Sequence, residues 1–133
     1  MTRRKLRENV FLILFQYDFF PLEEMDDQIK LYFGSEEKET LSEEEKLEIT
    51  VRAKGAILQI PDIDKKIEEQ AEGWTIARMG KVELTIIRLA LFEMFYDEEV
   101  PNPVAINEAI ELAKKFGGEE APSFVNGILA KLA

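Results

Sequence analysis

Hydrophobic positions recur at helical spacing along almost the whole chain. Residues 3–18 hold a dense apolar run, VFLILFQY, which Asp18 and Pro21 close. Pro21 can open a second helix that extends to about Phe33, where Gly34 stops it. No stretch alternates between polar and apolar residues for long enough to predict a strand. The pattern therefore predicts an all-helical protein.

The middle of the chain carries clear signals for the start and the end of helices. Ser42 followed by Glu45 is the pattern of a capping box, which starts a third helix. The apolar positions that recur along this helix are Leu47, Val51, Ile57, Leu58 and Ile60. We expect Pro61 and Asp62 to end it and to begin a fourth helix, which Gly73 breaks.

The segment 81–97 differs from the others because apolar residues occupy nearly every side of it. A helix without one polar face is usually central in the fold, so we expect this helix to be buried. The motif PNP at 101–103 makes a rigid turn before a sixth helix from about Val104 to Phe116, and Pro122 starts a last helix. The sequence thus predicts an all-α fold of about seven helices and no sheet.

The distribution of charge is uneven. The chain of 133 residues has a formal net charge of -10, yet Arg3, Arg4, Lys5 and Arg7 gather at one end. Cations at a helix N-terminus oppose the macrodipole, a cost that bound phosphates would offset. The alternative is a frayed, solvated end with a few surface salt bridges to the acidic body. Charge alone leaves both interpretations open.

Several kinds of chemistry are excluded or unsupported. The chain has no cysteine and no histidine, which excludes disulfides, thiol catalysis, the usual general base and the commonest zinc ligand. Gly80 and Lys81 do not fit a phosphate-binding loop, because Val82 stands where Ser or Thr is needed. No run approaches the roughly 18 apolar residues of a membrane helix. We expect a cytoplasmic protein without membrane association, enzyme activity, cofactor or metal.

Three stretches together point to a family. They are RRKLRE near the start, GWTIARMGKVELTIIRLALFEM in the middle, and PVAINEAIELAKKFGGEEAPSFVNGILAKLA at the end. In combination they resemble the transcription antitermination factor NusB family. The resemblance implies two packed helical subdomains, at about 1–73 and 74–133, with Trp74 as a packing anchor between them. It also implies a non-catalytic adaptor that binds single-stranded boxA RNA together with the ribosomal protein NusE, within the RNA polymerase antitermination complex.

The resemblance assigns RNA binding to a set of residues. They are Arg3, Arg4, Lys5, Arg7, Lys114, Lys115, Glu120 and Phe124. Phe124 in FVNG matches an aromatic that contacts RNA, although it could also be a core residue at the start of the last helix. Lys114 and Lys115 extend the phosphate track or complement the C-terminal end of their helix. Glu120 matches an acidic position that borders the RNA surface.

A second set of residues matches positions at or near the family's NusE surface. They are Phe15, Glu83 and Arg88, of which Arg88 could instead be a partly buried structural cation paired with a carboxylate. The chain departs from the family where Gln and Tyr are usual, at Leu12 and Phe15, and where Lys or Arg is usual, at Ser123. These departures predict weaker RNA binding by the protein alone and more reliance on NusE.

The rival interpretation is a helical interaction module that forms a homodimer and binds no RNA. The net charge of -10 and the apolar first helix favour it. Salt dependence separates the two, because RNA binding weakens steeply with salt and apolar dimerisation does not.

Overall fold

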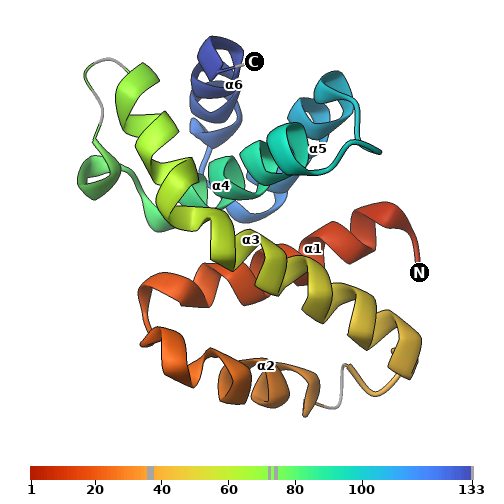
Figure 1. Ribbon diagram of the computed structural model, residues 1–133. Coiled ribbons are helices and arrows are strands. Elements are labelled where there is room, and N and C mark those ends of the chain that lie inside the picture. Colours follow the sequence, from red (N-terminus) through yellow and green to blue (C-terminus); the bar gives the residue numbers. More distant parts are fainter. Residues whose placement is uncertain (36–37, 72, 74, 133) are drawn as a thin grey trace. The chain divides into compact units, whose positions relative to one another are not determined.

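The computed structural model describes residues 1–35, 38–71, 73 and 75–132, and helices joined by short connections make up the chain (Figure 1). The six α-helices of the described residues are α1 (Arg3–Phe15), α2 (Met25–Phe33), α3 (Glu43–Gln70), α4 (Lys81–Tyr96), α5 (Asn102–Phe116) and α6 (Ala121–Leu132). Short 3₁₀ turns lie at Gln16–Asp18, Leu22–Glu24 and Ile76–Arg78. No strand occurs in these ranges, so the predicted all-α fold is confirmed. Trp74 lies outside the described residues.

The chain divides into two compact units, Met1–Ile57 and Leu58–Ala133. The division falls inside α3. The subdomain boundary near residue 73, which the resemblance implies, stays a prediction. The two helices predicted on either side of Pro61 are one helix, which explains why the α-helix count lies just below seven.

The prediction that Pro61 ends a helix was wrong. Proline inside a helix removes one hydrogen bond and costs about 3 kcal/mol. The buried residues of α3 keep a single stripe across this position, formed by Ile49, Ala53, Ala56, Ile60, Ile63 and Ile67. Each large aliphatic side chain that is fully buried contributes about 1.5–3 kcal/mol. Burial of Ile63 and Ile67 beyond the proline therefore outweighs its cost.

The predicted capping box at the start of α3 is confirmed. The Glu45 N–H donates to Ser42 Oγ at 3.1 Å, and the Ser42 N–H donates to Glu45 Oε1 at 2.9 Å. The Ser42 N–H, together with the terminal ammonium of Met1 at 3.1 Å from Oε2, holds the pKa of the Glu45 carboxyl below its ordinary value. The start of α3 is thus fixed by groups that the sequence motif names.

In the first unit, α1 buries the apolar face that its sequence predicts. Val10, Phe11 and Leu14 are almost fully buried. Asn9 is also buried, where its Nδ2 donates to the Lys5 carbonyl at 2.9 Å and its Oδ1 accepts from the Tyr32 hydroxyl of α2. Both polar ends of Asn9 are thereby satisfied, and the contact ties α1 to α2.

In the second unit, α4 is central, as predicted. Every residue from Leu84 to Leu91 is buried, and α4 packs against both α5 and α6. Arg88 is among these residues, with only 3% of its surface exposed. Its Nε and Nη2 donate to the two carboxylate oxygens of Asp64 on α3, both at 2.8 Å. Such a paired geometry lets a charged group be buried.

Candidate nucleic-acid interface

The basic end of the chain forms the first turns of α1. Arg3, Arg4 and Lys5 are exposed, and Arg7 is half-buried. Thr2 caps the helix by accepting from the Lys5 N–H at 3.1 Å. The first turn contains no acidic residue, so its cations oppose the macrodipole. This turn therefore presents more positive charge than helix stability alone favours.

Arg3 and Lys5 form ion pairs with carboxylates of the same unit. Arg3 Nη1 lies 2.9 Å from Glu48 Oε1, and Lys5 Nζ lies 3.4 Å from Glu8 Oε2. Such salt bridges are the ones that the solvated-end alternative expects. Exposed pairs contribute at most about 1 kcal/mol, so an incoming phosphate displaces these carboxylates at little cost. The pairs are thus compatible with both interpretations of the basic end.

In the second unit, three of the expected site residues come together. Glu83 of α4, and Glu120 and Phe124 at the start of α6, line one cavity of about 240 Å³. The remaining wall is formed by Met79, Gly80 and Ala121. We call this cavity the Glu83–Glu120 pocket. It unites a residue expected at the partner surface with two expected at the RNA surface.

Gly80 shapes the pocket. It is the N-cap of α4, with φ -62° and ψ 145°, a conformation open to any residue. The Glu83 carboxylate folds back over it, so closely that a Cβ on residue 80 would collide with Oε2. The carboxylate thus lies at the positive end of the α4 macrodipole, where negative charge is stabilised.

The lysines of α5 lie at its C-terminal end. Lys114 and Lys115 are exposed in the last turn, which is the position that complements the helix dipole. Lys114 Nζ lies 3.4 Å from Glu111 Oε1, and Lys115 Nζ lies 5.5 Å from the centre of the Phe116 ring. Both side chains are exposed enough to contact a phosphate. The structure is therefore compatible with a role in RNA binding and with a role at the C-terminal end of the helix.

The residues expected at the partner surface have different environments. Arg88 is buried and paired with Asp64, which supports its structural alternative. Phe15 is half-buried at the end of α1, in an aromatic series that leads from the buried Phe11 (centroids 6.1 Å apart) to the exposed Phe19 (5.3 Å). At the departures from the family pattern, Leu12 is half-buried and Ser123 is exposed.

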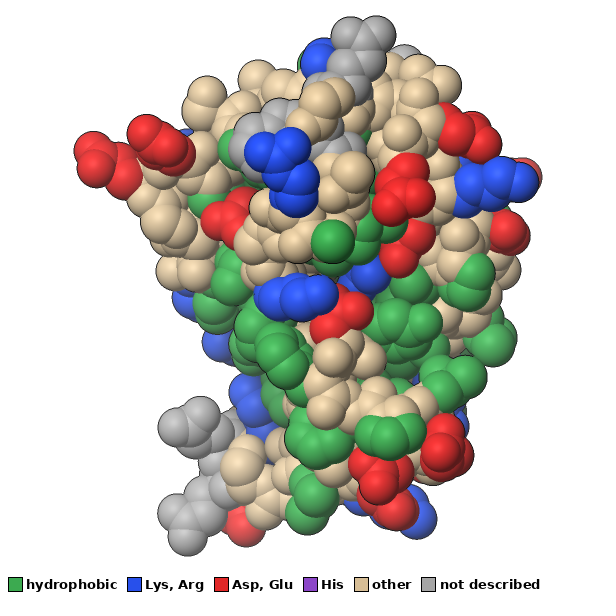
Figure 2. All heavy atoms as spheres, turned by 90° about the vertical axis from the view of Figure 1, so that its left-hand side faces the viewer, with side chains coloured by type: hydrophobic (Ala, Val, Ile, Leu, Met, Phe, Trp, Pro, Cys, Tyr) green, Lys and Arg blue, Asp and Glu red, His purple; other side chains and the backbone are tan. Residues whose placement is uncertain are grey.

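The turn that follows α1 exposes large hydrophobic side chains. Phe19, Phe20 and Leu22 are all exposed there, next to the half-buried Phe15. Figure 2 views the side of Figure 1 on which this turn lies and shows hydrophobic side chains at the surface among acidic and basic ones. Grouped exposed hydrophobic residues are typical of a protein-interaction surface.

The short segment before α4 is predicted from the sequence only as a tight connection. Arg78 and Lys81 are exposed on either side of Met79 and Gly80, which line the Glu83–Glu120 pocket. The pattern RMGK carried a usable signal, since two cations flank a glycine at a helix start.

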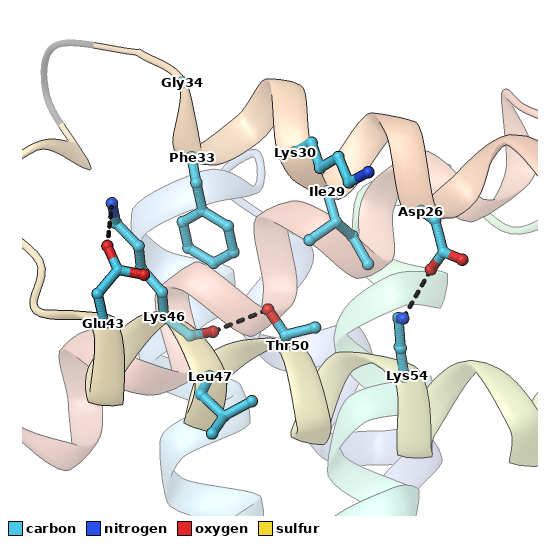
Figure 3. A pocket seen from close by; sticks show the side chains of 10 residues that line it. All are labelled: Asp26, Ile29, Lys30, Phe33, Gly34, Glu43, Lys46, Leu47, Thr50 and Lys54. Atoms are coloured by element: carbon cyan, nitrogen blue, oxygen red, sulfur yellow. Dashed lines mark hydrogen bonds and ion pairs between the residues drawn. The ribbon is translucent and has the colours of Figure 1, made fainter.

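A larger cavity, of about 630 Å³, lies between α2 and α3 in the first unit (Figure 3). The ring of Phe33 points from α2 toward α3, and an ion pair lies at each end of the cavity (Figure 3). Lys46 Nζ is 3.5 Å from Glu43 Oε1, and Lys54 Nζ is 2.7 Å from Asp26 Oδ1. The second pair joins α2 to α3 directly.

Replacing Lys54 with alanine is expected to raise the pKa of Asp26 toward its ordinary value. The hydrogen bond from Lys54, then its charge, holds that pKa down, while Lys30 adds a smaller effect. A lowered carboxyl pKa contributes stability above the unfolded-state pKa, and this contribution is lost as the pH falls through the folded-state pKa. NMR titration of the Asp26 carboxyl carbon measures the change, and Lys30→Ala is the matched control. An unchanged titration in Lys54→Ala would show that the pair does not form in solution.

Within the described ranges, no group of three or more acidic residues is arranged to hold a metal ion. No helix there is long and apolar enough to cross a membrane. The features that define the candidate site are thus the basic first turn of α1 and the acidic Glu83–Glu120 pocket.

Comparison with known proteins identifies the family. The NusB family model matches residues 4–133, so the chain belongs to the NusB family. The transcription antitermination protein NusB of Lachnoclostridium phytofermentans is 48% identical over 132 residues, covering 99% of this chain and 98% of that protein. The protein of the same name from Agathobacter rectalis is 43% identical over 133 residues, covering 100% of both.

Solved structures agree with this assignment. T. maritima NusB superposes with a TM-score of 0.82 at 33% identity, covering 100% of this chain and 91% of that one. A crystal structure of the antitermination factors NusB and NusE in complex with dsRNA matches with a TM-score of 0.81 at 27% identity. It covers 99% of this chain and 97% of the matched chain.

Proposed function

We propose that this protein is a non-catalytic RNA-binding adaptor in transcription antitermination of ribosomal RNA operons, which binds boxA RNA together with NusE. The observation that carries the proposal is the exposed basic first turn of α1 on a protein of net charge -10. Family membership supports it, as does the similar structure of NusB and NusE with RNA. The antitermination complex of RNA polymerase is the setting in which such an adaptor acts.

In this proposal the first unit positions the RNA. Arg3, Arg4, Lys5 and Arg7 contact phosphates, which fix the register of the strand but read no sequence. Arginine suits this role because its planar guanidinium binds phosphate through two parallel hydrogen bonds. Phe15 and the exposed Phe19 beside it are assigned to the NusE contact.

The second unit supplies base contacts in this proposal. Phe124 offers a ring on which a base stacks, and Lys114 and Lys115 extend the phosphate contacts. Glu83 and Glu120 border these contacts, with Glu83 also assigned to the NusE side. Arg88 supports the unit from within, through Asp64.

The test is fluorescence anisotropy of a labelled boxA RNA, titrated with the protein alone and with NusE, at low and moderate salt. We expect NusE to tighten binding, because Leu12, Phe15 and Ser123 replace groups that favour RNA or partner contacts in the family. We expect salt to weaken binding, because phosphate neutralisation releases counterions. A scrambled RNA of the same length is the control. Absence of binding with NusE at low salt would overturn the proposal.

The exposed group of Phe19, Phe20 and Leu22 favours a homodimer as the second candidate. Light scattering of the protein alone, at the two salt concentrations used for the RNA titrations, decides between the RNA-binding adaptor and the homodimer. A dimer that persists in salt, together with no RNA binding, would establish the interaction module. A monomer that binds RNA would leave these side chains to NusE.

A further inference from the structure

The cavity between α2 and α3, which we call the α2–α3 cavity, gathers positive charge on an acidic protein. Two carboxylates line it, those of Asp26 and Glu43, against the three lysines Lys30, Lys46 and Lys54. The chain as a whole has a formal net charge of -10, so this local balance is the reverse of the average. No residue of the cavity has a role in the proposed function. The cavity is therefore a candidate site for an anion.

The surplus positive charge lies at the end of the cavity where Asp26 is found. Lys54 Nζ is 2.7 Å from Asp26 Oδ1, and the Lys30 side chain extends toward the same carboxylate (Figure 3). The hydrogen bond from Lys54 and, less strongly, the charge of Lys30 lower the pKa of Asp26. One carboxylate cannot neutralise two lysines. The Asp26 side chain is also 70% exposed, so an incoming anion displaces it at little cost.

The middle of the cavity is apolar and contains a flat ring. Phe33 points from α2 toward α3, between the ion pairs at the two ends (Figure 3). Ile29, which is almost fully buried, lines the cavity one turn earlier on α2. The Thr50 hydroxyl donates to the Lys46 carbonyl at 2.8 Å, so its oxygen is still able to accept a hydrogen bond. A planar, partly polar group fits this middle section.

The opposite end of the cavity is polar. Lys46 Nζ lies 3.5 Å from Glu43 Oε1, and the Glu43 side chain is 93% exposed, so this pair is weak. It offers both a donor and an acceptor to a ligand. A long acyl tail would desolvate the pair without replacing its hydrogen bonds, which is unfavourable. The cavity therefore fits a ligand that is flat in the middle, polar at one end and anionic at the other.

We propose that the α2–α3 cavity binds a free nucleoside phosphate. The phosphate lies at Lys30 and Lys54, and the base stacks on Phe33. The polar edge of the base contacts Glu43 and Lys46. The volume of about 630 Å³ lies within the roughly 300–1,000 Å³ of small-molecule sites. All of these residues belong to the first unit, and the site requires neither RNA nor NusE, so it goes beyond the proposed function.

The dimensions of the cavity agree with such a ligand. On α3, Lys46, Thr50 and Lys54 follow one another at intervals of four residues, so they lie on the same side of the helix. The eight residues from Lys46 to Lys54 extend over about 12 Å of helix. This length accommodates a base, a sugar and a phosphate in a row.

The test is an NMR titration of isotope-labelled protein with ADP. ADP at up to about 1 mM, near the upper end of usual substrate levels, is expected to shift the backbone amide signals of Ile29, Phe33 and Thr50. Adenosine lacks the phosphates, and pyrophosphate lacks the base. Each is expected to bind at least about tenfold more weakly than ADP, because one set of contacts is missing.

Two variants remove the two sets of contacts separately. Lys30→Gln with Lys54→Gln is expected to weaken ADP binding by about tenfold or more, because charge-assisted hydrogen bonds to phosphate are lost. Phe33→Leu removes the flat ring but stays apolar, so it is expected to weaken ADP binding by about fivefold and to leave pyrophosphate binding unchanged. Lys65→Gln, at an exposed position outside the cavity lining, is the matched control and is expected to bind ADP normally.

Four other outcomes would each overturn the proposal. The first is that ADP moves no signal of the cavity, and the second is that it moves only those of the basic first turn of α1. The third is that pyrophosphate binds as tightly as ADP, which would make the cavity a simple anion site. The fourth is that boxA RNA or NusE shifts the cavity signals without ADP, so that a macromolecule fills the cavity. The proposed function does not depend on any of these results.

Discussion

Replacing Arg88 with methionine is expected to lower the free energy of unfolding by about 3 kcal/mol, measured by urea denaturation. Removal of one partner from a buried ion pair typically costs about 3–5 kcal/mol, because the other charge loses its compensation. Asp64 retains some contact with solvent, so we expect the lower end of this range. Methionine preserves most of the volume of the side chain, so the loss reports the charge pair more than a cavity.

Adding Asp64→Asn to Arg88→Met is expected to recover part of the loss, because no uncompensated charge then remains. Arg78→Ala, an exposed arginine in the same unit, is the control and is expected to change stability by no more than about 0.5 kcal/mol. If Arg88→Met cost no more than this control, the ion pair with Asp64 would not be the structural element that we describe.

Replacing Arg3 and Arg7 together with alanine is expected to weaken binding of boxA RNA by about tenfold or more at moderate salt. Hydrogen bonds to charged groups contribute about 1.5–3 kcal/mol each, and two guanidinium groups are removed. The salt dependence should also fall. For single strands the logarithmic slope is about 0.7 per phosphate contact, so the loss of two contacts lowers it by about 1.4. Anisotropy titrations over a series of salt concentrations measure both quantities.

The matched control is Lys30→Ala with Lys65→Ala, which removes the same charge from exposed positions without an assigned RNA contact. We expect this pair to leave the salt slope unchanged. Circular dichroism of each variant shows whether the fold is retained, which matters because Arg7 is half-buried. Equal slopes for the two double variants would mean that the basic end acts only through net charge.

The helical pattern predicted most of the fold because apolar spacing and capping residues act locally. The capping box at Ser42, the buried α4 and the C-terminal end of α5 at Phe116 all follow from neighbouring residues, whereas α5 begins at Asn102, inside the predicted turn. The error at Pro61 has the opposite origin. Whether a proline ends a helix depends on what the following residues bury, and that is decided by tertiary packing.

The same limit applies to the faces of α3. Leu47, Val51 and Leu58 share helical spacing in the sequence, yet all three are exposed. The buried stripe instead uses small residues such as Ala53 and Ala56, whose weak hydrophobic signal hides their close packing. The hydrophobicity of the individual residues therefore does not by itself predict which face of this helix is buried.

The candidate site could be predicted residue by residue but not as an assembly. Arg3 and Phe124 were expected from the resemblance, but composition does not show that Arg3 is exposed and Phe124 half-buried. The meeting of Glu83 with Glu120 depends on how α4 and α6 pack, which no local pattern contains. That Arg88 pairs with a carboxylate was one of the expected alternatives, but Asp64 could not be named as the partner, since the two residues are separated by 24 positions.

The division of the chain inside α3 bears on how the protein folds during synthesis. The first 57 residues contain α1, α2 and the first half of α3, so the first unit can become compact before α4 leaves the ribosome. The last three helices then pack mainly on their neighbours along the chain, α4 with α5 and α5 with α6. Contacts between neighbouring helices close short loops, which favours rapid folding. The order of the helices therefore suits a chain that completes one part before it begins the next.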